Sequence, residues 1–154
     1  MKFVKGNILD AEYGVIGHQV NCQLVMGAGL AKQIRTKYPR VFAEYQEVMS
    51  LLTPEERLGK CQMVEVIPQR LLVANLFGQL HYGRNKRYTD YNALSMALVG
   101  LREWHIRNVG VKDFPIYLPH GIGCNLAGGD WEVVKGLIGS AIPDAIIVRY
   151  EGGK

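Results

Sequence analysis

The chain has 154 residues, of which 48% are hydrophobic and 21% are charged. These proportions are those of an ordinary globular protein, so they exclude intrinsic disorder, and the length suits a single domain spanning residues 1–154. The formal net charge of +4 and the pI near 9.0 are compatible with a small anionic ligand, with weak nucleic-acid contact, or with a solvated basic surface.

The cysteines and histidines give no sign of a disulfide framework or a metal site. Cys22, Cys61 and Cys124 lie far apart without a C-x-x-C pair, and the four histidines show no H-x-x-x-H spacing. We therefore expect a reducing compartment and neither metal nor cofactor. Because the amino terminus lacks the apolar core of a signal peptide and no apolar run approaches about 18 residues, we expect a cytoplasmic protein without a membrane partner.

Hydrophobic periodicity and turn residues divide the first part of the chain into short elements. Pro39 ends one predicted helix and suits the first turn of the next, while Thr53 followed by Pro54 is typical of a helix start. The predicted elements are a strand at 2–5, a turn or single helical turn at 8–11, a buried strand at 15–20, helices at 28–37 and 40–52, and a short helical turn at 53–56.

The second part continues the alternation of strands and helices. Its elements are strands near 60–67 and 71–77, a polar loop at 78–88, a long helix at 90–107, a strand at 114–118, a loop at 119–129, a helix at 130–141 and a strand at 145–150. The strand at 60–67 alternates and is a candidate edge strand, whereas the one at 71–77 is almost wholly apolar, as a strand covered on both faces is.

This order predicts an α/β fold, a three-layer α/β/α sandwich with a mostly parallel mixed sheet. In such folds ligands bind at the carboxyl ends of the strands. Two loops leave interior strands at such an end, residues 19–29 and 119–129, and both are rich in glycine. Their coincidence predicts a ligand site between them.

The first loop joins a buried strand to a helix through Gly27 and Gly29. Glycine lets the backbone approach a bound group closely, and the exposed N–H groups and dipole at a helix start favour negative charge. A tight turn without a ligand is the alternative, because the spacing is neither G-x-G-x-x-G nor a Walker motif.

The second loop contains four glycines, whose exposed N–H groups can hold phosphate oxygens. Together the two loops could clamp a diphosphate from two sides. Asp130 follows the loop, either as the N-cap of the last helix or as a carboxylate that orients water or a ribose hydroxyl.

Three further groups of polar residues have a structural and a functional interpretation. His18, between apolar neighbours, is either a core histidine or a general acid or base. Asn21 either forms a turn or binds a ribose hydroxyl pair in the cleft. The basic residues of 84–87 are either a solvated loop or a phosphate contact.

Four segments in this order and spacing resemble the macro domain family. They are residues 4–9 (Val-Lys-Gly-Asn-Ile-Leu), 18–22 (His-Gln-Val-Asn-Cys), 27–31 (Gly-Ala-Gly-Leu-Ala) and 123–128 (Gly-Cys-Asn-Leu-Ala-Gly). Within the family the chain is most similar to the branch containing the yeast-type ADP-ribose 1″-phosphate phosphatases. The second loop also resembles the branch that removes ADP-ribose from proteins or DNA.

The resemblance implies a crescent-shaped site for ADP-ribose. Asn7 stands where macro domains usually have an aspartate that accepts the adenine amino group, and Asn125 replaces a usual glycine of the diphosphate loop. Asn21 and the segment 27–29 match the region around the distal ribose. The ligand-binding residues implied in this way are Asn7, Ile8, Met26, Gly27, Ala28, Gly29, Leu30, Gly123, Cys124, Asn125, Leu126, Ala127 and Gly128.

The resemblance also implies a metal-independent hydrolase that removes the terminal phosphate of ADP-ribose 1″-phosphate. His18 falls where phosphatase-like members have a histidine proposed to act on that phosphate, with Asn21 fixing the distal ribose and Asp130 a further candidate for orienting water. The partner is then ADP-ribose or its 1″-phosphate, with ADP-ribosylated macromolecules as a further candidate.

Other functions remain open. A non-catalytic reader of ADP-ribose would use the same cleft. An ADP-ribosyl hydrolase acting on modified protein or DNA is disfavoured, because that branch has a lysine in the segment matching 76–80 and an acid where Ala127 stands, unless Lys86 reaches the site. Direct single-strand nucleic-acid binding is the least favoured function.

Overall fold

The computed structural model describes residues 1–109 and 113–151. Six strands form one sheet in the order β1-β6-β5-β2-β4-β3, in which β3 runs antiparallel to β4 and the other neighbours are parallel. The strands are β1 (Lys2–Gly6), β2 (Tyr13–Asn21), β3 (Cys61–Val66), β4 (Arg70–Gln79), β5 (Ile116–Pro119) and β6 (Ile146–Tyr150).

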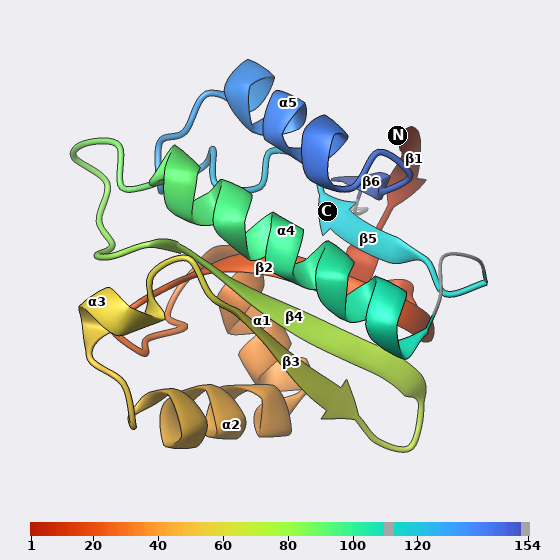
Figure 1. Ribbon diagram of the computed structural model, residues 1–154, viewed down its shortest axis with the longest axis horizontal. Coiled ribbons are helices and arrows are strands. Elements are labelled where there is room, and N and C mark those ends of the chain that lie inside the picture. The colour runs from red at the N-terminus through yellow and green to blue at the C-terminus, as the bar shows by residue number, and fades with distance from the viewer. Residues whose placement is uncertain (110–112, 152–154) are drawn as a thin grey trace.

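Helices cover both faces of the sheet, as Figure 1 shows. α4 and α5 pack on one face, and α1 and α2 pack on the other. The helices are the 3-10 turn η1 (Ile8–Asp10), α1 (Gly29–Lys37), α2 (Pro39–Met49), α3 (Pro54–Arg57), α4 (Tyr91–Asn108) and α5 (Trp131–Ala141). The predicted three-layer sandwich with a mostly parallel mixed sheet is confirmed, including the edge position of β3.

Local sequence explains where the helices begin. Thr53 and Glu56 form a reciprocal capping box at the start of α3, and Asp90 accepts a hydrogen bond from Ala93 at the start of α4. Pro39 is the first residue of α2, where its missing N–H is not needed. These caps satisfy N–H groups that a helix cannot pair internally.

The central strands separate two hydrophobic cores. Ile16 and Phe77 lie in the core beneath α1 and α2, whereas Val15 and Leu76 lie in the core beneath α4 and α5. Successive residues therefore point to opposite faces, and each face is covered by helices. This is why the sequence of β4 is apolar without alternation.

β4 ends two residues later than the sequence indicates. β4 continues through Gly78 to Gln79, which pairs with Asn21 of β2 and bridges to Thr89. The polar composition of this segment predicts a loop, but pairing on both sides keeps it extended. As a result Gln79 lies at the carboxyl end of the sheet beside the end of β2.

None of the helices in the described ranges is long and apolar enough to cross a membrane.

Candidate functional site

A cleft of about 380 Å³ lies at the carboxyl ends of β2, β4 and β5. One wall is the segment 25–31, which holds the start of α1, and the opposite wall is the segment 119–127 of the β5–α5 loop. The β4–α4 loop, residues 80–90, closes one side and contributes Tyr82, Gly83 and Arg84. The predicted pairing of the two glycine-rich loops around one site is therefore what the structure shows.

The predicted residues divide into those that line the cleft and those that do not. His18, Asn21, Met26, Gly27, Ala28, Gly29, Leu30, Gly123, Asn125, Leu126 and Ala127 line it. Asn7, Ile8, Cys124, Gly128 and Asp130 lie outside the lining.

The start of α1 presents unpaired N–H groups to the cleft. Ala28 stands at the N-cap position without a side-chain hydrogen bond, and the first intrahelical bond joins Lys32 N to Ala28 O. The N–H groups of Gly29, Leu30 and Ala31 therefore have no partner within the helix. Gly29 adopts a φ of 60°, which glycine tolerates best. A helix start of this kind attracts an anion.

The facing loop presents a second group of backbone donors. Gly121 and Gly123 both have a φ above 70°, and the chain folds back on itself by bonds such as Gly129 N to Gly123 O at 2.9 Å. Within residues 1–109 and 113–151, no protein acceptor is paired with the N–H groups of Leu126 and Ala127. Successive N–H groups in a curved segment form an anion-binding concavity.

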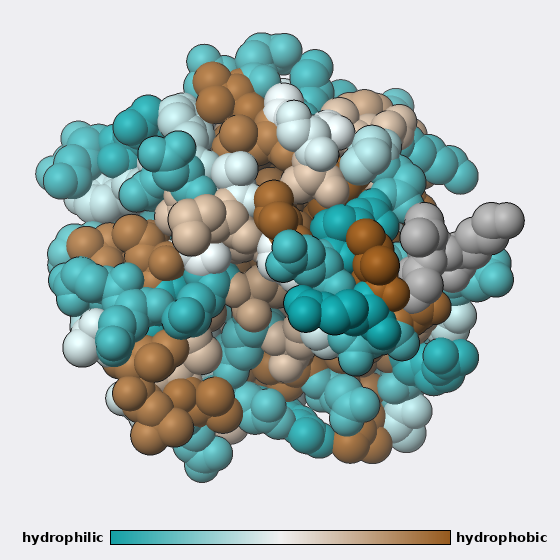
Figure 2. Space-filling view, viewed as in Figure 1, coloured by the Kyte–Doolittle hydropathy of each residue, from teal (hydrophilic) through white to brown (hydrophobic). Residues whose placement is uncertain are grey.

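The cleft carries no negative side chain. Among the described residues that line it there is no aspartate or glutamate, and Arg84 is the cationic side chain in the lining. The chain segments that form the cleft, 13–43, 66–89 and 114–129, contain no acidic residue at all. Figure 2 shows hydrophilic side chains at the upper left of the molecule, where Figure 1 places the β4–α4 loop. An anionic ligand therefore meets no like charge in the cleft.

His18 is held deep in the wall of the cleft. Its side chain is 1% exposed, Nε2 lies 2.7 Å from Asn75 Oδ1, and Nδ1 is buried without a protein partner in the described part of the chain. Desolvation lowers the pKa of His18 from 6.5 to about 4, and the hydrogen bond to Asn75 offsets part of that decrease. His18 is therefore neutral near neutral pH, and burial makes its ring a weaker base than that of an exposed histidine.

Asn21 shapes the first loop with its side chain. Oδ1 accepts a hydrogen bond from Gln23 N at 2.9 Å, and Nδ2 donates to Val25 O at 2.8 Å. The hydroxyl of Tyr45, from α2, donates to the main-chain oxygen of Asn21 at 2.8 Å. The turn-forming interpretation is thus correct, and the catalytic role of Asn21 stays a prediction.

A separate polar network stiffens the opposite side of the cleft. Gln19 Nε2 donates to Gln79 Oε1 and to Thr89 Oγ1, both at 2.9 Å. Thr89 in turn donates to Gly123 O at 2.6 Å. The network joins β2, β4 and the β5–α5 loop, so it holds that loop at a fixed distance from the two strands.

Asp130 and Asn7 serve as caps. Asp130 Oδ1 accepts from Glu132 N at 2.9 Å at the start of α5, and Asn7 Oδ1 accepts from Leu9 N at 2.9 Å at the start of η1. The N-cap interpretation of Asp130 is the one that the geometry supports. Neither side chain lines the cleft, so their roles toward water and adenine stay predictions without a contact in this structure.

Three further predicted residues also lie outside the lining of the cleft: Ile8, Cys124 and Gly128. Ile8 is 6% exposed in the core, and Cys124 Sγ donates to Ile122 O at 3.3 Å. Burial raises the pKa of Cys124 to about 11, so its thiol is protonated and unreactive. Gly128 packs against the backbone of Lys86 and Arg87, where a Cβ would approach Lys86 O to 3.1 Å.

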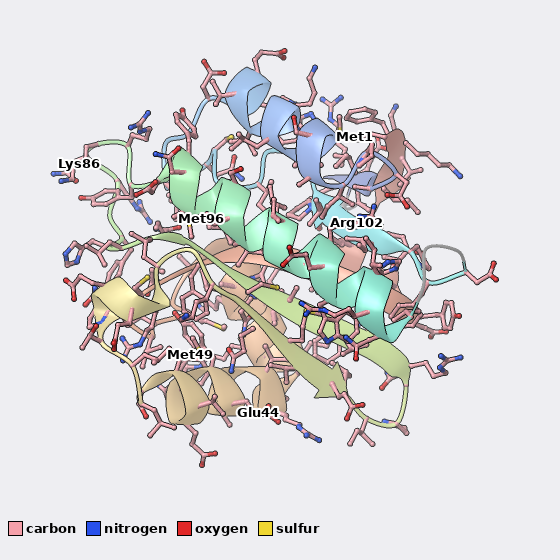
Figure 3. All side chains as sticks on the ribbon, viewed as in Figure 1. Met1, Glu44, Met49, Lys86, Met96 and Arg102 are labelled. Atoms are coloured by element: carbon pink, nitrogen blue, oxygen red, sulfur yellow. The ribbon has the colours of Figure 1, made fainter. Side chains whose placement is uncertain are left out.

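Lys86 does not reach the cleft. Figure 3 shows it at the outer edge of the molecule, and its Nζ lies 5.3 Å from the centre of the Tyr88 ring. No lysine is among the lining residues in the described ranges.

Sequence reasoning missed several residues of the lining, among them Gln79, Tyr82 and His120. His120 follows β5 directly, and its ring lies 4.6 Å from that of Trp131, centre to centre. Its place at a strand end, within the second glycine-rich loop, was a usable signal. Gln79 was hidden because its segment predicts a loop rather than the end of β4.

In the part of the chain that the structure describes, no three histidine, cysteine or acidic side chains gather closely enough to hold a metal ion.

No protein-family model matches the chain. An uncharacterised 17.5 kDa protein of Enterobacteria phage T4 is 29% identical over 157 residues, covering 98% of this chain and 97% of the phage protein. A DNA ADP-ribosyl glycohydrolase of Mycobacterium tuberculosis is also 29% identical, over 96% of this chain and 42% of that protein. This chain therefore spans less than half the length of the mycobacterial relative.

Solved structures share the fold. A Bacteroides thetaiotaomicron protein of unknown function aligns with a TM-score of 0.82 at 24% identity over 97% of each chain. The macrodomain of Mycobacterium tuberculosis DarG aligns with a TM-score of 0.75 at 24% identity over 98% of each chain. Thermosipho africanus DarTG in complex with ADP-ribose aligns with a TM-score of 0.71 at 17% identity, over 99% of this chain and 42% of the other. The chain therefore has the macrodomain fold.

Proposed function

We propose that this chain, with its macrodomain fold, binds ADP-ribose in the cleft between the two glycine-rich loops. The observation that carries the proposal is the pairing of two sets of backbone N–H groups, at the start of α1 and in the β5–α5 loop, across a cleft whose lining in the described ranges includes no carboxylate. A diphosphate matches this arrangement, because it presents acceptor oxygens on two sides and brings negative charge.

The size of the cleft and its mixed lining suit a nucleotide-sugar. A volume of about 380 Å³ is within the range of small-molecule sites. Apolar side chains such as Met26, Leu30 and Ile122 can contact flat or hydrocarbon parts of a ligand, and Gln79 offers an amide to hydroxyl groups. The structural similarity to Thermosipho africanus DarTG, which was solved with ADP-ribose, supports the same ligand here.

The finer proposal is hydrolysis of ADP-ribose 1″-phosphate. In this reaction water adds to phosphorus, the P–O bond to the ribose breaks, and the ribose oxygen takes a proton, which gives inorganic phosphate and ADP-ribose. His18 is the one buried imidazole in the lining, and its unpaired Nδ1 can accept the proton of the water. Asn21 would fix the ribose, and Asp130 would act on water only if the cap at α5 opened.

The second candidate is release of ADP-ribose from modified DNA, because the mycobacterial relative is a DNA ADP-ribosyl glycohydrolase. The chain lacks a lysine in the segment 76–80 and has Ala127 where that branch has an acid. Release would therefore need His18 or His120 to activate water directly. A reader that binds ADP-ribose without turnover, free or on modified macromolecules, is the third candidate.

One set of assays separates these candidates. The purified protein is incubated with ADP-ribose 1″-phosphate and, separately, with ADP-ribosylated single-stranded DNA, and the release of phosphate or ADP-ribose is measured. Phosphate release that is lost in His18→Ala, with ADP-ribose binding retained, supports the phosphatase. Release of ADP-ribose from DNA alone supports the second candidate. Binding without any release identifies a reader, and no binding of ADP-ribose contradicts the proposal as a whole.

A further inference from the structure

A row of polar side chains, which we call the relay, crosses three strands beneath α2 and ends at His18. The register of the sheet places Asn75 of β4 beside His18 of β2 and beside Gln62 of β3. Gln62 Nε2 donates to the main-chain oxygen of Glu44 in α2 at 3.0 Å. Asn75 Nδ2 donates to Gln62 Oε1 at 3.0 Å, and Asn75 Oδ1 lies 2.7 Å from His18 Nε2.

The main-chain oxygen of Glu44, at the end of the row away from His18, determines which group donates in each hydrogen bond. A main-chain carbonyl oxygen can only accept, so the amide nitrogen of Gln62 must face Glu44. The oxygen of Gln62 then faces Asn75, which must present its own amide nitrogen there and its oxygen to His18. Since that oxygen can only accept, the proton of the neutral imidazole resides on Nε2.

The other ring nitrogen is consequently an acceptor without a protein partner. His18 Nδ1 is buried, and no hydrogen-bond partner for it exists among residues 1–109 and 113–151. His18 nevertheless lines the cleft. A buried polar atom left unpaired destabilises a protein, so a protein that keeps one beside a ligand cleft gains stability when a ligand satisfies it.

We propose that Gln62 and Asn75 are positioning residues that hold His18 as the Nε2–H tautomer, so that Nδ1 accepts a hydrogen bond from a hydroxyl group or a water molecule in the cleft. This inference rests on the proposed function for the identity of the ligand, ADP-ribose. It adds a specificity: the position next to Nδ1 admits a hydrogen-bond donor and disfavours a fully ionised phosphate oxygen, which can only accept.

The same arrangement assigns a direction of proton transfer. In either hydrolytic candidate, neutral His18 takes a proton from the attacking water on Nδ1, while its Nε2–H stays with Asn75. The proton gained on Nδ1 is then released to the leaving oxygen or to a water molecule, which returns His18 to its neutral form. Neither Gln62 nor Asn75 lines the cleft, so both act on the ligand only through His18.

The test is nitrogen-15 NMR of the imidazoles at neutral pH, without and with saturating ADP-ribose. His105 serves as an internal control, because its Nε2 lies 2.6 Å from the carbonyl oxygen of Phe114 and must also carry a proton. His18 is assigned by its loss in His18→Gln. We expect a protonated Nε2 and an unprotonated Nδ1 in the free protein, and a shift of the Nδ1 resonance toward lower frequency when ADP-ribose binds.

Three outcomes bear on the inference. A proton on Nδ1, or a doubly protonated ring, in the free protein overturns the relay. ADP-ribose binding, measured by calorimetry on the same sample, without any change at Nδ1 overturns the ligand contact. The predicted tautomer in a protein that does not bind ADP-ribose supports the relay and counts against the proposed function, so the two failures are distinguishable.

A variant gives an independent readout. Asn75→Asp replaces the neutral acceptor by a carboxylate, which stabilises the imidazolium, so both nitrogens of His18 should be protonated at neutral pH. Gln62→Glu supplies a matched control one position further along the row, because it adds the same charge without touching the ring. Identical His18 signals in wild type and Asn75→Asp would contradict the relay.

Discussion

The hydroxyl of Tyr45, in the middle of α2, donates a hydrogen bond to the main-chain oxygen of Asn21 at the end of β2, over 2.8 Å. The same hydroxyl lies 3.2 Å from Asn21 Oδ1, which organises the turn that leads to α1. Tyr45 is fully buried, and its ring stacks on Phe77 of β4. A core side chain on the face of the sheet covered by α1 and α2 therefore holds the wall of the cleft at the start of α1 in place.

Removing this hydroxyl should loosen the first loop. In Tyr45→Phe the oxygen of Asn21 loses a buried partner, so we expect a decrease of about 1–3 kcal/mol in the free energy of unfolding. We also expect a several-fold weaker affinity for ADP-ribose, because the N–H groups at the start of α1 become less well placed. Denaturant unfolding and calorimetry measure the two effects. Tyr150→Phe, at a site that is 68% exposed, should change neither. Unchanged affinity in a destabilised Tyr45→Phe would show that the hydroxyl serves stability alone.

The second loop depends on the backbone conformation of Gly123. Its φ is 74°, and a Cβ there would stand 3.0 Å from Gln19 Oε1 and 3.1 Å from Thr89 Oγ1. Gly123→Ala should cost about 1–2 kcal/mol of stability from the left-handed backbone and weaken ADP-ribose binding by at least tenfold, because Gln19 must move. Both are measured on the purified variant by thermal unfolding and calorimetry.

The matched control is Gly136→Ala in α5, where a Cβ would meet nothing within 4 Å. Alanine favours a helix over glycine by up to about 1 kcal/mol, so this variant should be slightly more stable and should bind ADP-ribose normally. Equal binding by the two alanine variants would argue against a ligand at the β5–α5 loop.

Stability should fall as the pH decreases through the range set by His18. Burial lowers the folded-state pKa of His18 from 6.5 to about 4, so the unfolded chain binds the proton more tightly. Neutral His18 makes its full contribution to the free energy of unfolding above pH 6.5. That free energy decreases by on the order of 3 kcal/mol as the pH falls toward 4. Urea unfolding at several pH values should show this decrease in wild type and a shallower one in His18→Gln. His81→Gln, an exposed site, should follow wild type; a wild-type slope in His18→Gln would contradict the assignment.

Arg84 should contribute to affinity in a salt-dependent way. It is the cation in the lining and it is exposed, so its attraction for a diphosphate is screened by salt. Arg84→Ala should weaken ADP-ribose binding by a few-fold at low ionic strength and less at high ionic strength. Arg107→Ala, at the other end of α4, should leave both values unchanged. An equal loss at every salt concentration would indicate that the side chain acts by shape rather than by charge.

The sequence predicts the fold well because its strands and helices differ strongly in period and in their boundary residues. The apolar segment 71–77, the proline at 39 and the capping residues at 53 and 130 each indicate one local structure, and the sheet brings them together as expected. The positions of both glycine-rich loops follow from the rule that parallel strands end at one edge.

The details of the site depend on long-range contacts that a local pattern does not contain. Asn75 looks like one polar residue in an apolar strand, yet its register against Gln62 and His18 makes it the centre of a buried row. The sequence predicts a loop at Gln79, because the residues next to it in the chain give no sign of its pairing with β2. Asp130 has an ordinary capping signature, and the cap is what the structure shows.

Calorimetric titration of wild type and Gly123→Ala with ADP-ribose, and with AMP in parallel, shows whether the two glycine-rich loops bind a diphosphate. We predict that wild type binds ADP-ribose at one site, that AMP binds much more weakly because it lacks the diphosphate, and that Gly123→Ala loses most of the affinity. Absence of ADP-ribose binding by wild type, or equal affinities for ADP-ribose and AMP, would contradict a diphosphate clamp between the two glycine-rich loops.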